Sequence, residues 1–397
     1  MGTTWETTQL GSVCRIIPGY AFKSSDWKAK GIPVVKIKNI SSDNSVDLLT
    51  TDFVSESILT PRLEKFVLKD GDILLAMTGA TAGKVGRVRT KRELLLNQRV
   101  AKIAPFQADP DFIWAVVSSQ EYQELFYRLA DGSAQPNMSG GQIEGVEIPL
   151  PSIGAQQRIA GILSAYDELI ENNQRRIKIL ESMARALYRE WFVYFRYPGH
   201  KSVPLVPSTL GNIPQGWEVT TLGHLVNMRK GKNITKATIR EGIVPVVAGG
   251  LEPAYFHDVP NTRGPVITVS ASGANAGYVN LYHTDVWASD CSYIDSTATE
   301  QIFYYYLWLD HRRTAVTHLQ RGSAQPHVYT KDLEELASPR IPEEILSTFC
   351  SQITPIFNLV KVMTARINIL RTTRDALLPR LLSGQIEVSS DYETGAS

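Results

Sequence analysis

Apolar residues recur at alternating steps of four and three positions in two separate stretches of the chain. The first stretch covers residues 159–191 and the second covers residues 349–381, displaced by 190 positions. Such steps place apolar side chains along one stripe of a helix, as in the seam of a coiled coil. One helix cannot bury this stripe alone, so we expect the two helices to pack against each other. The seam positions are Ile159, Leu163, Tyr166, Ile170, Asn173, Ile177, Leu180, Ala184, Leu187 and Trp191, then Phe349, Ile353, Ile356, Val360, Met363, Ile367, Leu370, Arg374, Leu377 and Leu381.

Polar residues and prolines modify this pattern at a few positions. Asn173 interrupts the first seam, where it either fixes the register of the pair or lies at a solvated end. Pro355 is expected to begin or kink the second helix, because proline has no N–H group to donate to the helix. Pro379 is expected to mark the fraying end of this helix, with Ser383 and Gly384 as its cap.

The sequence that precedes each helix is also repeated within the chain. The matches keep the same order, and a period near 190 is too long for a solenoid, so the sequence predicts a duplicated domain. Each copy contains short β-rich runs, such as residues 32–37 and 265–269, separated by glycine turns. Gly-Ser-Ala-Gln-Pro at 132–136 recurs at 322–326, Trp-Glu at 5–6 recurs at 217–218, Leu-Gly at 10–11 recurs at 222–223, and Gly-Ala-Thr-Ala-Gly at 79–83 is echoed by Gly-Ala-Asn-Ala-Gly at 273–277.

The repeat predicts an α+β fold, in which two mixed α/β domains are joined by two long coiled-coil helices. An internal pseudo-two-fold repeat would make these helices antiparallel. Prolines and glycines between residues 198 and 216 predict a linker without regular structure. The expected parts are a mixed domain at 1–151, a helix at 152–196, the linker at 197–214, a second mixed domain at 215–342, a second helix at 343–384 and a tail at 385–397.

Composition excludes several classes of protein. The three cysteines are scattered and no histidine has ligand-type neighbours, so neither a disulfide framework nor a zinc site is expected. The N-terminus lacks the pattern of a signal peptide, and the aromatic run at 301–309 is too short to cross a bilayer. These features favour a cytoplasmic protein with no membrane partner.

The net charge of +1 does not by itself indicate a nucleic-acid partner, but its distribution does. Cations crowd residues 84–102 against a single acid, and residues 229–240 form a second basic stretch. One such stretch is more often a solvated face, whereas two in a near-neutral chain favour nucleic-acid binding.

Motifs for catalysis are missing from the sequence. Residues 78–85 resemble a P-loop, but three residues rather than four separate the glycines, and Val85 replaces the magnesium-binding Ser or Thr. A glycine-rich hairpin that approaches another surface closely is the better interpretation, and it would let Lys84 and Arg87 reach phosphates. The chain has no Asn/Asp-Pro-Pro-aromatic run of an amino-methyltransferase, and its Pro-Asp pair at 110–111 lacks the rest of a nuclease core.

This organisation resembles the specificity subunit of type I restriction–modification systems over nearly the whole chain. The most specific pieces are Gly-Ser-Ala-Gln-Pro-Asn at 132–137, Ile-Pro-Leu-Pro at 148–151 followed by Gln-Gln-Arg-Ile at 156–159, and Leu-Leu-Pro-Arg-Leu-Leu-Ser-Gly at 377–384. The second copy departs from the pattern, with Pro-Arg-Ile-Pro at 339–342 and two glutamates at 343–344. The start of the second helix is therefore less well defined by the sequence.

The resemblance implies that each mixed domain is a target-recognition domain and that the helices are spacer regions. Each domain would read one half of a split, asymmetric site in double-stranded DNA. The seam spans about 50 Å at about 1.5 Å per residue, enough to place half-sites about one DNA turn apart. Two modification subunits and the restriction subunits would be partners. They would carry S-adenosylmethionine, ATP and magnesium, leaving this chain without a cofactor. Candidate DNA contacts are Lys36, Lys38, Thr81, Lys84, Arg87, Arg99, Arg229, Lys230, Lys232, Asn275 and Tyr278.

Two other functions compete with this interpretation. A coiled-coil scaffold without a nucleic-acid role explains the seam but leaves the paired basic stretches unexplained. An enzyme with its own methyltransferase or nuclease activity would bind S-adenosylmethionine or cut DNA without added subunits.

Overall fold

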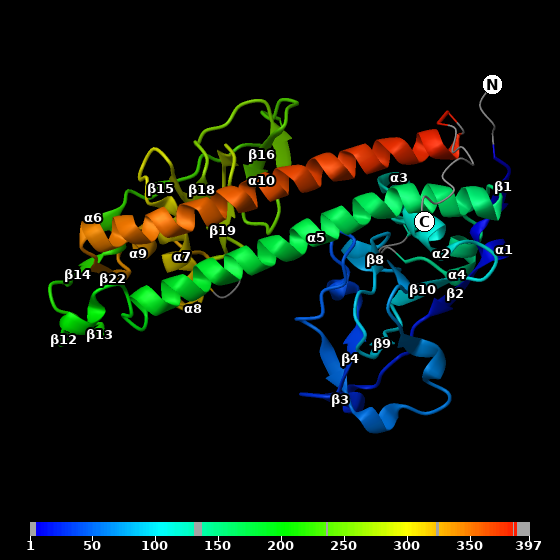
Figure 1. The fold of residues 1–397 in the computed structure, drawn as a ribbon, viewed down its shortest axis with the longest axis horizontal. Coiled ribbons are helices and arrows are strands. Elements are labelled where there is room, and N and C mark those ends of the chain that lie inside the picture. Colours follow the sequence, from blue (N-terminus) through cyan, green and yellow to red (C-terminus); the bar gives the residue numbers. More distant parts are fainter. Residues whose placement is uncertain (1–4, 131–136, 236, 323–324, 384, 387–397) are drawn as a thin grey trace, which may run out of the picture. The chain divides into compact units, whose positions relative to one another are not determined.

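The computed structural model describes residues 5–130, 137–235, 237–322, 325–383 and 385–386. The chain forms two compact units: unit 1 comprises residues 1–172 and 367–397, and unit 2 comprises residues 173–366. Each unit contains one mixed domain and half of each long helix (Figure 1). These helices are α5 (Ile153–Phe192) and α10 (Glu343–Leu382), which lie inside the ranges predicted for them.

Unit 1 is built on two sheets. One is antiparallel, in the order β2-β10-β7-β8, and the other has the order β3-β5-β4-β9-β6, with β4 parallel to β9. A short antiparallel pair, β1 with β11, closes the domain. The strands are β1 (Thr7–Gln9), β2 (Cys14–Pro18), β3 (Trp27–Lys28), β4 (Ile32–Val35), β5 (Asp52–Val54), β6 (Val67–Leu68), β7 (Ile73–Ala76), β8 (Val85–Arg87), β9 (Leu94–Leu96), β10 (Val100–Pro105) and β11 (Glu147–Pro149), and the helices are α1 (Leu10–Val13), α2 (Pro110–Val117), α3 (Gln120–Ala130) and α4 (Gly140–Glu144).

Unit 2 repeats this plan with fewer strands in its second sheet. Its antiparallel sheet has the order β15-β21-β18-β19, and its second sheet has the order β17-β16-β20, with β16 parallel to β20. The strands are β14 (Glu218–Thr221), β15 (Arg229–Lys230), β16 (Val244–Val247), β17 (Tyr255–His257), β18 (Val266–Ser270), β19 (Val279–Tyr282), β20 (Trp287–Ala288), β21 (Cys291–Asp295) and β22 (Ala337–Arg340), and the helices are α6 (Leu222–Leu225), α7 (Ile302–His311), α8 (Arg313–His318) and α9 (Thr330–Glu334). Short 3-10 helices η1 (Ser24–Asp26), η2 (Ile37–Asn39), η3 (Glu56–Ile58), η4 (Glu64–Phe66), η5 (Gly79–Thr81) and η6 (His200–Ser202) complete the chain.

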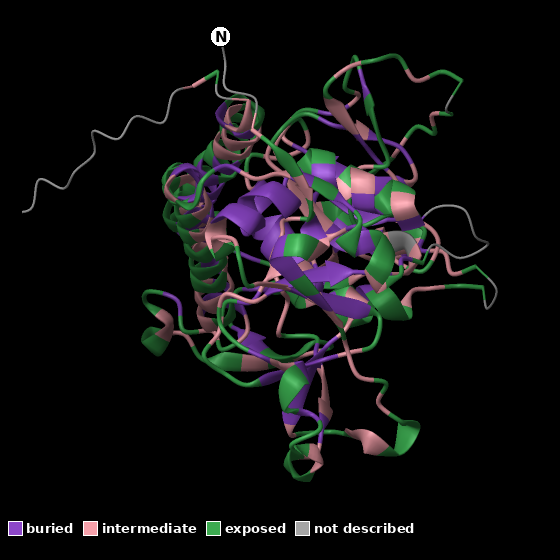
Figure 2. Ribbon diagram, turned by 90° about the vertical axis from the view of Figure 1, so that its right-hand side faces the viewer, coloured by how far each residue is buried: buried purple, intermediate pink, exposed green. Residues whose placement is uncertain are grey.

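The predicted duplication is confirmed down to individual strand pairs. Each domain combines an antiparallel four-stranded sheet with a second sheet that contains one parallel pair. A proline of the inner strand lies opposite a phenylalanine of its neighbour in both copies, as Pro33 with Phe53 and Pro245 with Phe256. The strands of the four-stranded sheets are mostly buried, and the exposed residues lie in the outer turns (Figure 2). The mixed α+β fold predicted from the repeat is therefore present.

The glycine-rich turn is a hairpin that touches a helix, as the sequence predicts. Gly83 follows β7 and η5 with a φ of +85°, and its counterpart Gly277 has a φ of +83°. A Cβ on Gly83 would lie 2.6 Å from the carbonyl oxygen of Gln123 in α3. Glycine is therefore required here both by the left-handed backbone and by the approach of α3.

The two long helices run antiparallel, and each unit shows this separately. In unit 1 the core that holds Ile159 and Leu163 near the start of α5 also holds Leu378 and Leu381 near the end of α10. In unit 2 the aromatic ring of Phe349, near the start of α10, lies 5.4 Å from that of Trp191, near the end of α5. The start of each helix therefore packs against the end of the other, as in an antiparallel pair.

The seam positions differ in burial. Asn173 is buried, with 6% of its surface exposed, so it does not lie at a solvated end. Arg374 is the charged seam position, and it is half-buried. Ile159, Leu163, Ile170, Ala184, Trp191, Phe349, Ile353, Val360, Met363, Ile367 and Leu381 are buried, whereas Tyr166, Ile177, Leu180, Leu187, Ile356, Leu370 and Leu377 are half-buried.

Both prolines of the second helix lie within it. Pro355 does not begin α10, which corrects the first of the two alternatives expected for this residue, because the helix starts at Glu343 and includes the proline. Pro355 and Ser351, whose carbonyl loses its helical partner, are both exposed, so water can satisfy the free oxygen. Pro379 lies in the last turn of α10, which ends at Leu382, close to the predicted end. Of the predicted cap, Gly384 lies outside the described residues.

The linker also contains structure that the sequence did not predict. β12 (Leu205–Ser208) pairs with β13 (Gly211–Pro214) in an antiparallel hairpin. Prolines are tolerated because the hairpin has only two strands, each with one edge that needs no backbone donor. Gly211 supplies the left-handed turn, with a φ of +89°.

A polar network joins the mixed domain of unit 1 to both long helices. Asp167 of α5 accepts hydrogen bonds from Trp114 Nε1 of α2 at 2.7 Å and from Arg374 Nη1 of α10 at 2.6 Å. Arg374 also donates to Asp375, 2.8 Å away. Burial alone would lower the pKa of Arg374, but the two aspartates reverse this effect and raise it. One carboxylate therefore links three helices that are distant in sequence.

Asp167→Ala should lower the free energy of unfolding by about 3 kcal/mol. The substitution leaves Arg374 and the indole N–H of Trp114 without an acceptor in a largely buried environment, and such orphaned groups are costly. Urea unfolding followed by circular dichroism measures the change. Glu168→Ala is the control, since Glu168 is the exposed neighbour of Asp167 and should change little. Equal stability of the two variants would contradict the role assigned to this network.

Candidate nucleic-acid interface

The loops at one end of the four-stranded sheet of unit 1 lie together. Strand β2 ends where β10 begins, since Pro18 pairs with Ala101, and β7 ends at the same level, since Ala76 pairs with Val100. The backbone N–H of Gly19 donates to the carbonyl of Val100 at 3.0 Å, and that of Met77 donates to the carbonyl of Arg99 at 3.0 Å. Three chain segments are thus fixed side by side by backbone hydrogen bonds.

Most candidate residues of the first copy gather at this end. Thr81 and Lys84 lie in the glycine-rich turn that follows β7, and Arg99 directly precedes β10 and is exposed. The Oγ1 atom of Thr81 has no hydrogen-bond partner among the described residues. Lys36 and Lys38 flank Ile37, whose Cδ1 lies 3.9 Å from where a Cβ on Gly79 would be. Residues separated by more than 60 positions in the sequence therefore share one edge.

Two of these lysines are partly neutralised. Lys36 Nζ and Lys38 Nζ each lie 2.9 Å from Asp52 Oδ2. Hydrogen bonds from Lys36 and then Lys38 lower the pKa of the Asp52 carboxyl. Lys36 Nζ also lies 3.5 Å from the ring centroid of Trp27, a cation–π contact. The pair therefore contributes about one unit of positive charge rather than two.

Arg87 does not belong to this edge, which corrects the expectation from sequence. It pairs with Ile73 at the start of β7, the opposite end of the sheet from the turn. Its side chain is 11% exposed, forms an ion pair with Asp111 and donates to the carbonyl of Gly71 at 3.2 Å. The guanidinium also stacks near Trp114, 5.7 Å from the ring centroid. The Arg87 guanidinium is therefore largely buried and engaged within the fold.

The second copy presents the matching sheet end. Lys230 pairs with Ser292 at the end of β15, and Gly231 donates to the carbonyl of Cys291 at 2.8 Å. Lys232 is exposed, and its carbonyl accepts a hydrogen bond from Trp287 Nε1 at 2.8 Å. The turn after β18 carries Asn275 and Tyr278. Lys230, Lys232, Asn275 and Tyr278 therefore lie at the edge equivalent to that of unit 1.

The side chains of this second turn make their own local contacts. Asn275 Nδ2 lies 3.4 Å from the carbonyl oxygen of Gly249, at the long end of hydrogen bonding. Arg313 lies over the ring of Tyr278, 5.5 Å from its centroid. The two turns therefore share a backbone conformation but present different polar side chains.

Arg229 is the second correction among the candidates. Its guanidinium is directed away from this edge, toward Thr297 Oγ1 at 3.3 Å and the buried carboxylate of Asp295 at 4.0 Å. Asp295 ends β21, at the opposite end of the sheet from Lys230. Arg229 therefore points toward the opposite end of the sheet, although its side chain is 44% exposed.

Sequence reasoning missed part of this edge. Asn137 bridges Thr78, and Met138 donates to the carbonyl of Met77 at 2.9 Å. In the second copy His327 bridges Ser272, and Val328 donates to the carbonyl of Ala271 at 2.9 Å. Both segments directly follow the repeated Gly-Ser-Ala-Gln-Pro motif, of which residues 132–136 and 323–324 lie outside the described residues. The repeated motif could have pointed to these two segments. A loop sequence that is retained in both copies, next to the same sheet edge, indicates that both copies use it for the same function.

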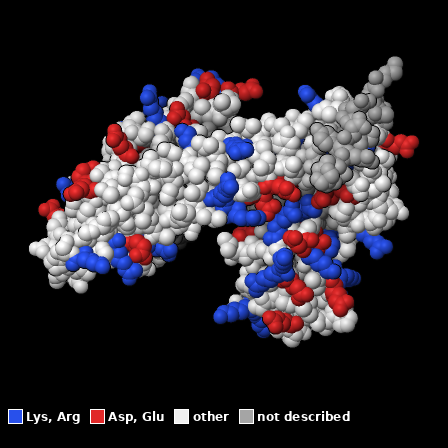
Figure 3. Space-filling model, viewed as in Figure 1, with Lys and Arg blue, Asp and Glu red and all other residues white. Residues whose placement is uncertain are grey.

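Charges of both signs are mixed over the mixed domain of unit 1. On the face drawn in Figure 3, lysines and arginines alternate with aspartates and glutamates over this domain. Much of the positive charge is therefore balanced locally, as the Lys36–Asp52 pair illustrates. Unpaired cations such as Arg99 consequently matter more than the total number of basic residues.

Comparison with known proteins covers both copies. The sequence matches the family described as "Type I restriction modification DNA specificity domain" over residues 2–182 and 214–342. It is 26% identical to the type I restriction enzyme MjaIX specificity subunit of Methanocaldococcus jannaschii over 75% of this chain and 74% of that protein. It is 23% identical to the putative MjaX specificity subunit of the same organism, over 97% of this chain and 94% of that protein.

A solved structure supports the fold. The specificity subunit of a type I restriction–modification system from M. genitalium superposes with a TM-score of 0.54, at 17% sequence identity, over 95% of this chain and 96% of that chain. The family match includes both mixed domains and much of α5, and the resemblance noted in the sequence is confirmed. The chain belongs to the family of type I restriction–modification DNA specificity subunits.

Proposed function

We propose that this chain is the non-catalytic subunit that selects the DNA sequence for a type I restriction–modification complex. Each mixed domain, residues 1–151 and 215–342, recognises one half of a split site. The observation that carries this proposal is the duplicated sheet edge with different side chains. Thr81, Lys84 and Arg99 occupy the edge of the first copy, whereas Lys230, Lys232, Asn275 and Tyr278 occupy that of the second. Equal backbones with unequal polar groups suit two readers of different half-sites.

The long helices would set the distance between the half-sites and dock the modification subunits. Their exposed apolar residues support docking, because they repeat with the same period as the seam. Leu169 and Leu359 are 44% and 43% exposed, and Ile179 and Ile369 are 54% and 66% exposed. Each member of a pair lies 190 positions from the other. Two equivalent apolar faces favour two modification subunits.

Each face is built within one unit from both helices. Leu169 and Ile369 belong to unit 1, and Leu359 and Ile179 belong to unit 2. All four directly precede a seam position, so they occupy the same flank of their helices, and antiparallel packing brings equal flanks to one side. In Figure 3 the surface formed by α10 in unit 2 is mostly uncharged. An exposed apolar surface of this kind is typical of a protein–protein interface.

The chemistry of the complex would be supplied by other subunits. Modification subunits would bind S-adenosylmethionine and methylate adenine, and restriction subunits would use ATP and magnesium. We place the complex in the cytoplasm. α10 is long and apolar enough to span a bilayer, with a mean hydropathy of 1.2 over its most apolar window. Its apolar seam packs inside both units, so the same composition follows from helix pairing.

A coiled-coil scaffold without a nucleic-acid role is not favoured. The matched family is defined by DNA specificity, and the match includes the mixed domains that a scaffold would not need.

The proposal is tested by exchanging residues 1–151 for the corresponding domain of another family member. One half of the methylated site should change and the other should stay, because each domain reads its half independently. Mapping methylated adenines in cells that carry the complete system gives the result. Exchange of residues 215–342 is the reciprocal control. A single exchange that altered both halves would refute independent reading.

Arg99→Ala and Arg87→Ala should behave differently in DNA binding. Loss of the exposed Arg99 should reduce the dependence of log affinity on log salt by about one, the effect of one lost phosphate contact. Arg87→Ala should leave this slope unchanged and lower the free energy of unfolding by about 2 kcal/mol, since its charged hydrogen bonds are internal. Binding of the chain with its modification subunits to a duplex carrying the mapped site is measured across salt concentrations. If Arg87→Ala lowered the salt slope and Arg99→Ala did not, Arg87 rather than Arg99 would contact the DNA.

Leu169→Asp combined with Ile369→Asp should remove one modification subunit from the complex, because charges in the apolar face oppose its burial. The equivalent pair, Leu359→Asp with Ile179→Asp, should remove the other. Native mass spectrometry counts the subunits. Leu49→Asp is the control, since Leu49 is 95% exposed and lies outside both faces. Two bound subunits in the variant with all four substitutions would exclude these faces.

A further inference from the structure

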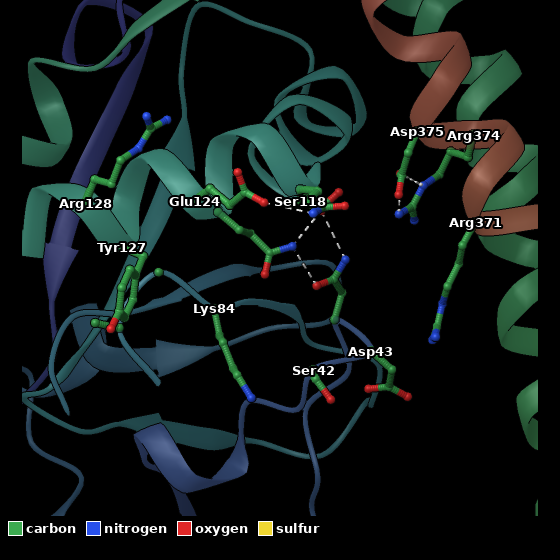
Figure 4. Close-up of a pocket in the computed structure, with 15 residues that line it drawn as sticks. Ser42, Asp43, Lys84, Ser118, Glu124, Tyr127, Arg128, Arg371, Arg374 and Asp375 are labelled. Carbon is green, nitrogen blue, oxygen red and sulfur yellow. Dashed lines mark hydrogen bonds and ion pairs between the residues drawn. The ribbon is translucent and has the colours of Figure 1, made fainter. Parts of the chain in front are cut away.

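A cavity of about 640 Å³ lies within unit 1, between the mixed domain and the last turns of α10. Its walls come from three parts of the chain (Figure 4). Residues 42–44 form one wall, the glycine-rich turn with Lys84 and helix α3 form the second, and Arg371, Arg374 and Asp375 of α10 form the third. No pattern in the sequence indicates that Lys84 and α10 share a cavity.

The acids that line the cavity are already engaged. Asp43 Oδ1 accepts hydrogen bonds from the backbone N–H and the hydroxyl of Ser45, at 3.1 and 2.6 Å. Glu124 Oε1 accepts from Gln120 Nε2 at 2.8 Å. Asp375 accepts from Arg374 at 2.8 Å. The carboxylates therefore have donors other than the remaining cations of the cavity.

Lys84 and Arg371 have no side-chain acceptor among the described residues of the chain. They enter from opposite walls, and Figure 4 shows their charged ends directed toward the same region, near Ser42 and Asp43. Arg128 also lines the cavity, but its guanidinium is directed away from the other two. Two cationic groups thus converge on one place, beside the single carboxylate of Asp43.

Arg371 is the more unusual of the two. It is half-buried, and burial lowers the pKa of its guanidinium, an effect that the charge of Asp43 only partly offsets. A guanidinium removed from water without a bound acceptor destabilises the fold that holds it. An anion in the cavity would relieve this cost and would gain charge-assisted hydrogen bonds.

The walls around these cations are rigidly held. Asn44 adopts a left-handed backbone with a φ of +64°, and its side chain donates to the carbonyl of Ser118 at 3.2 Å. Gln123 Nε2 donates to Asn44 Oδ1 at 3.1 Å and to the same carbonyl at 2.8 Å. On the other side, Asp167 fixes Arg374, one turn of α10 after Arg371. The distance between the two walls is thereby restrained before any ligand arrives.

The second copy lacks these cations. The position that corresponds to Lys84 in the repeated turn is Tyr278, and the position that corresponds to Arg371 in the repeated seam is Glu181. Glu181 forms an ion pair with Arg185 at 3.5 Å. The cationic pair is therefore not a consequence of the shared architecture but a property of the first copy alone.

We propose that this cavity binds a phosphate group, held between the ammonium of Lys84 and the guanidinium of Arg371. The source of the phosphate is either the DNA backbone or a free phosphate anion, and the two sources share this recognition chemistry. With DNA as the source, the inference rests on the proposed function and makes the spacer helix α10 a direct DNA contact. With free phosphate as the source, the inference does not depend on the proposed function in DNA recognition.

The first experiment titrates the full chain with inorganic phosphate and follows its melting temperature at constant ionic strength, with chloride as the reference anion. Phosphate at about five times its Kd should raise the melting temperature by about 1–2 °C. The Lys84→Ala, Arg371→Ala double variant should lose this response. Arg380→Ala is the matched control, because nine residues place Arg380 on the opposite face of α10 from Arg371.

The second experiment measures DNA binding by the complex with its modification subunits across salt concentrations. If the backbone supplies the phosphate, the double variant should weaken binding to all sequences equally and lower the salt slope by about one. Arg380→Ala should leave the slope unchanged. Binding of the wild-type complex to the mapped site tests the proposed function separately. Absence of this binding would contradict the proposed function, whereas an unchanged salt slope in the double variant would contradict the DNA phosphate contact.

The outcomes separate the sources and can overturn the proposal. A phosphate-specific melting response that the double variant loses assigns the site to free phosphate, and a lowered salt slope assigns it to the DNA backbone. If neither measurement distinguishes the double variant from Arg380→Ala, the proposal is wrong. Arg371→Ala without added anion should melt no lower than the wild type, since it removes an uncompensated charge. A clear loss of stability would instead show that Arg371 has a structural role.

Discussion

Burial of the apolar seam between α5 and α10 is the interaction on which the rest of the structure depends. Neither helix can leave its stripe in water, since each large apolar side chain gains about 1.5–3 kcal/mol on full burial. In unit 1 the stripe joins the core of the mixed domain through Ile159 and Leu381, and in unit 2 it does so through Trp191 and Phe349. Each mixed domain is thus anchored to both helices at once.

The seam also restricts where polar chemistry can lie. Charged groups within the pair are retained only where a partner is supplied, as Asp167 supplies one for Arg374. Arg371, one turn away, lacks such a partner among the described residues and faces a cavity instead. The contrast between these two arginines, one turn apart in α10, identifies the cavity as a place where an anion would be stabilised.

Duplication gives both copies the same backbone edge and leaves its side chains free to differ. Gly83 and Gly277 keep their turns in a left-handed conformation close to a helix, so the backbone of the edge is fixed by contacts that a larger residue would break. The residues presented on that frame, such as Arg99 in one copy and Tyr278 in the other, are not required by the fold. Specificity can therefore change while the architecture stays.

The sequence by itself determined the duplication, the two helices, their antiparallel pairing and the glycine turn, because these follow from periodicity and from backbone restrictions that act locally. It did not determine the outcome for Arg87, Arg229 or Pro355. The direction in which an arginine side chain points depends on acids such as Asp111 and Asp295 that are near only after folding. A proline is tolerated within a helix only where water reaches the carbonyl it leaves free. The position of Lys84 and Arg371 in one cavity was likewise decided by tertiary structure, since 287 positions separate them and no local pattern records that they share it.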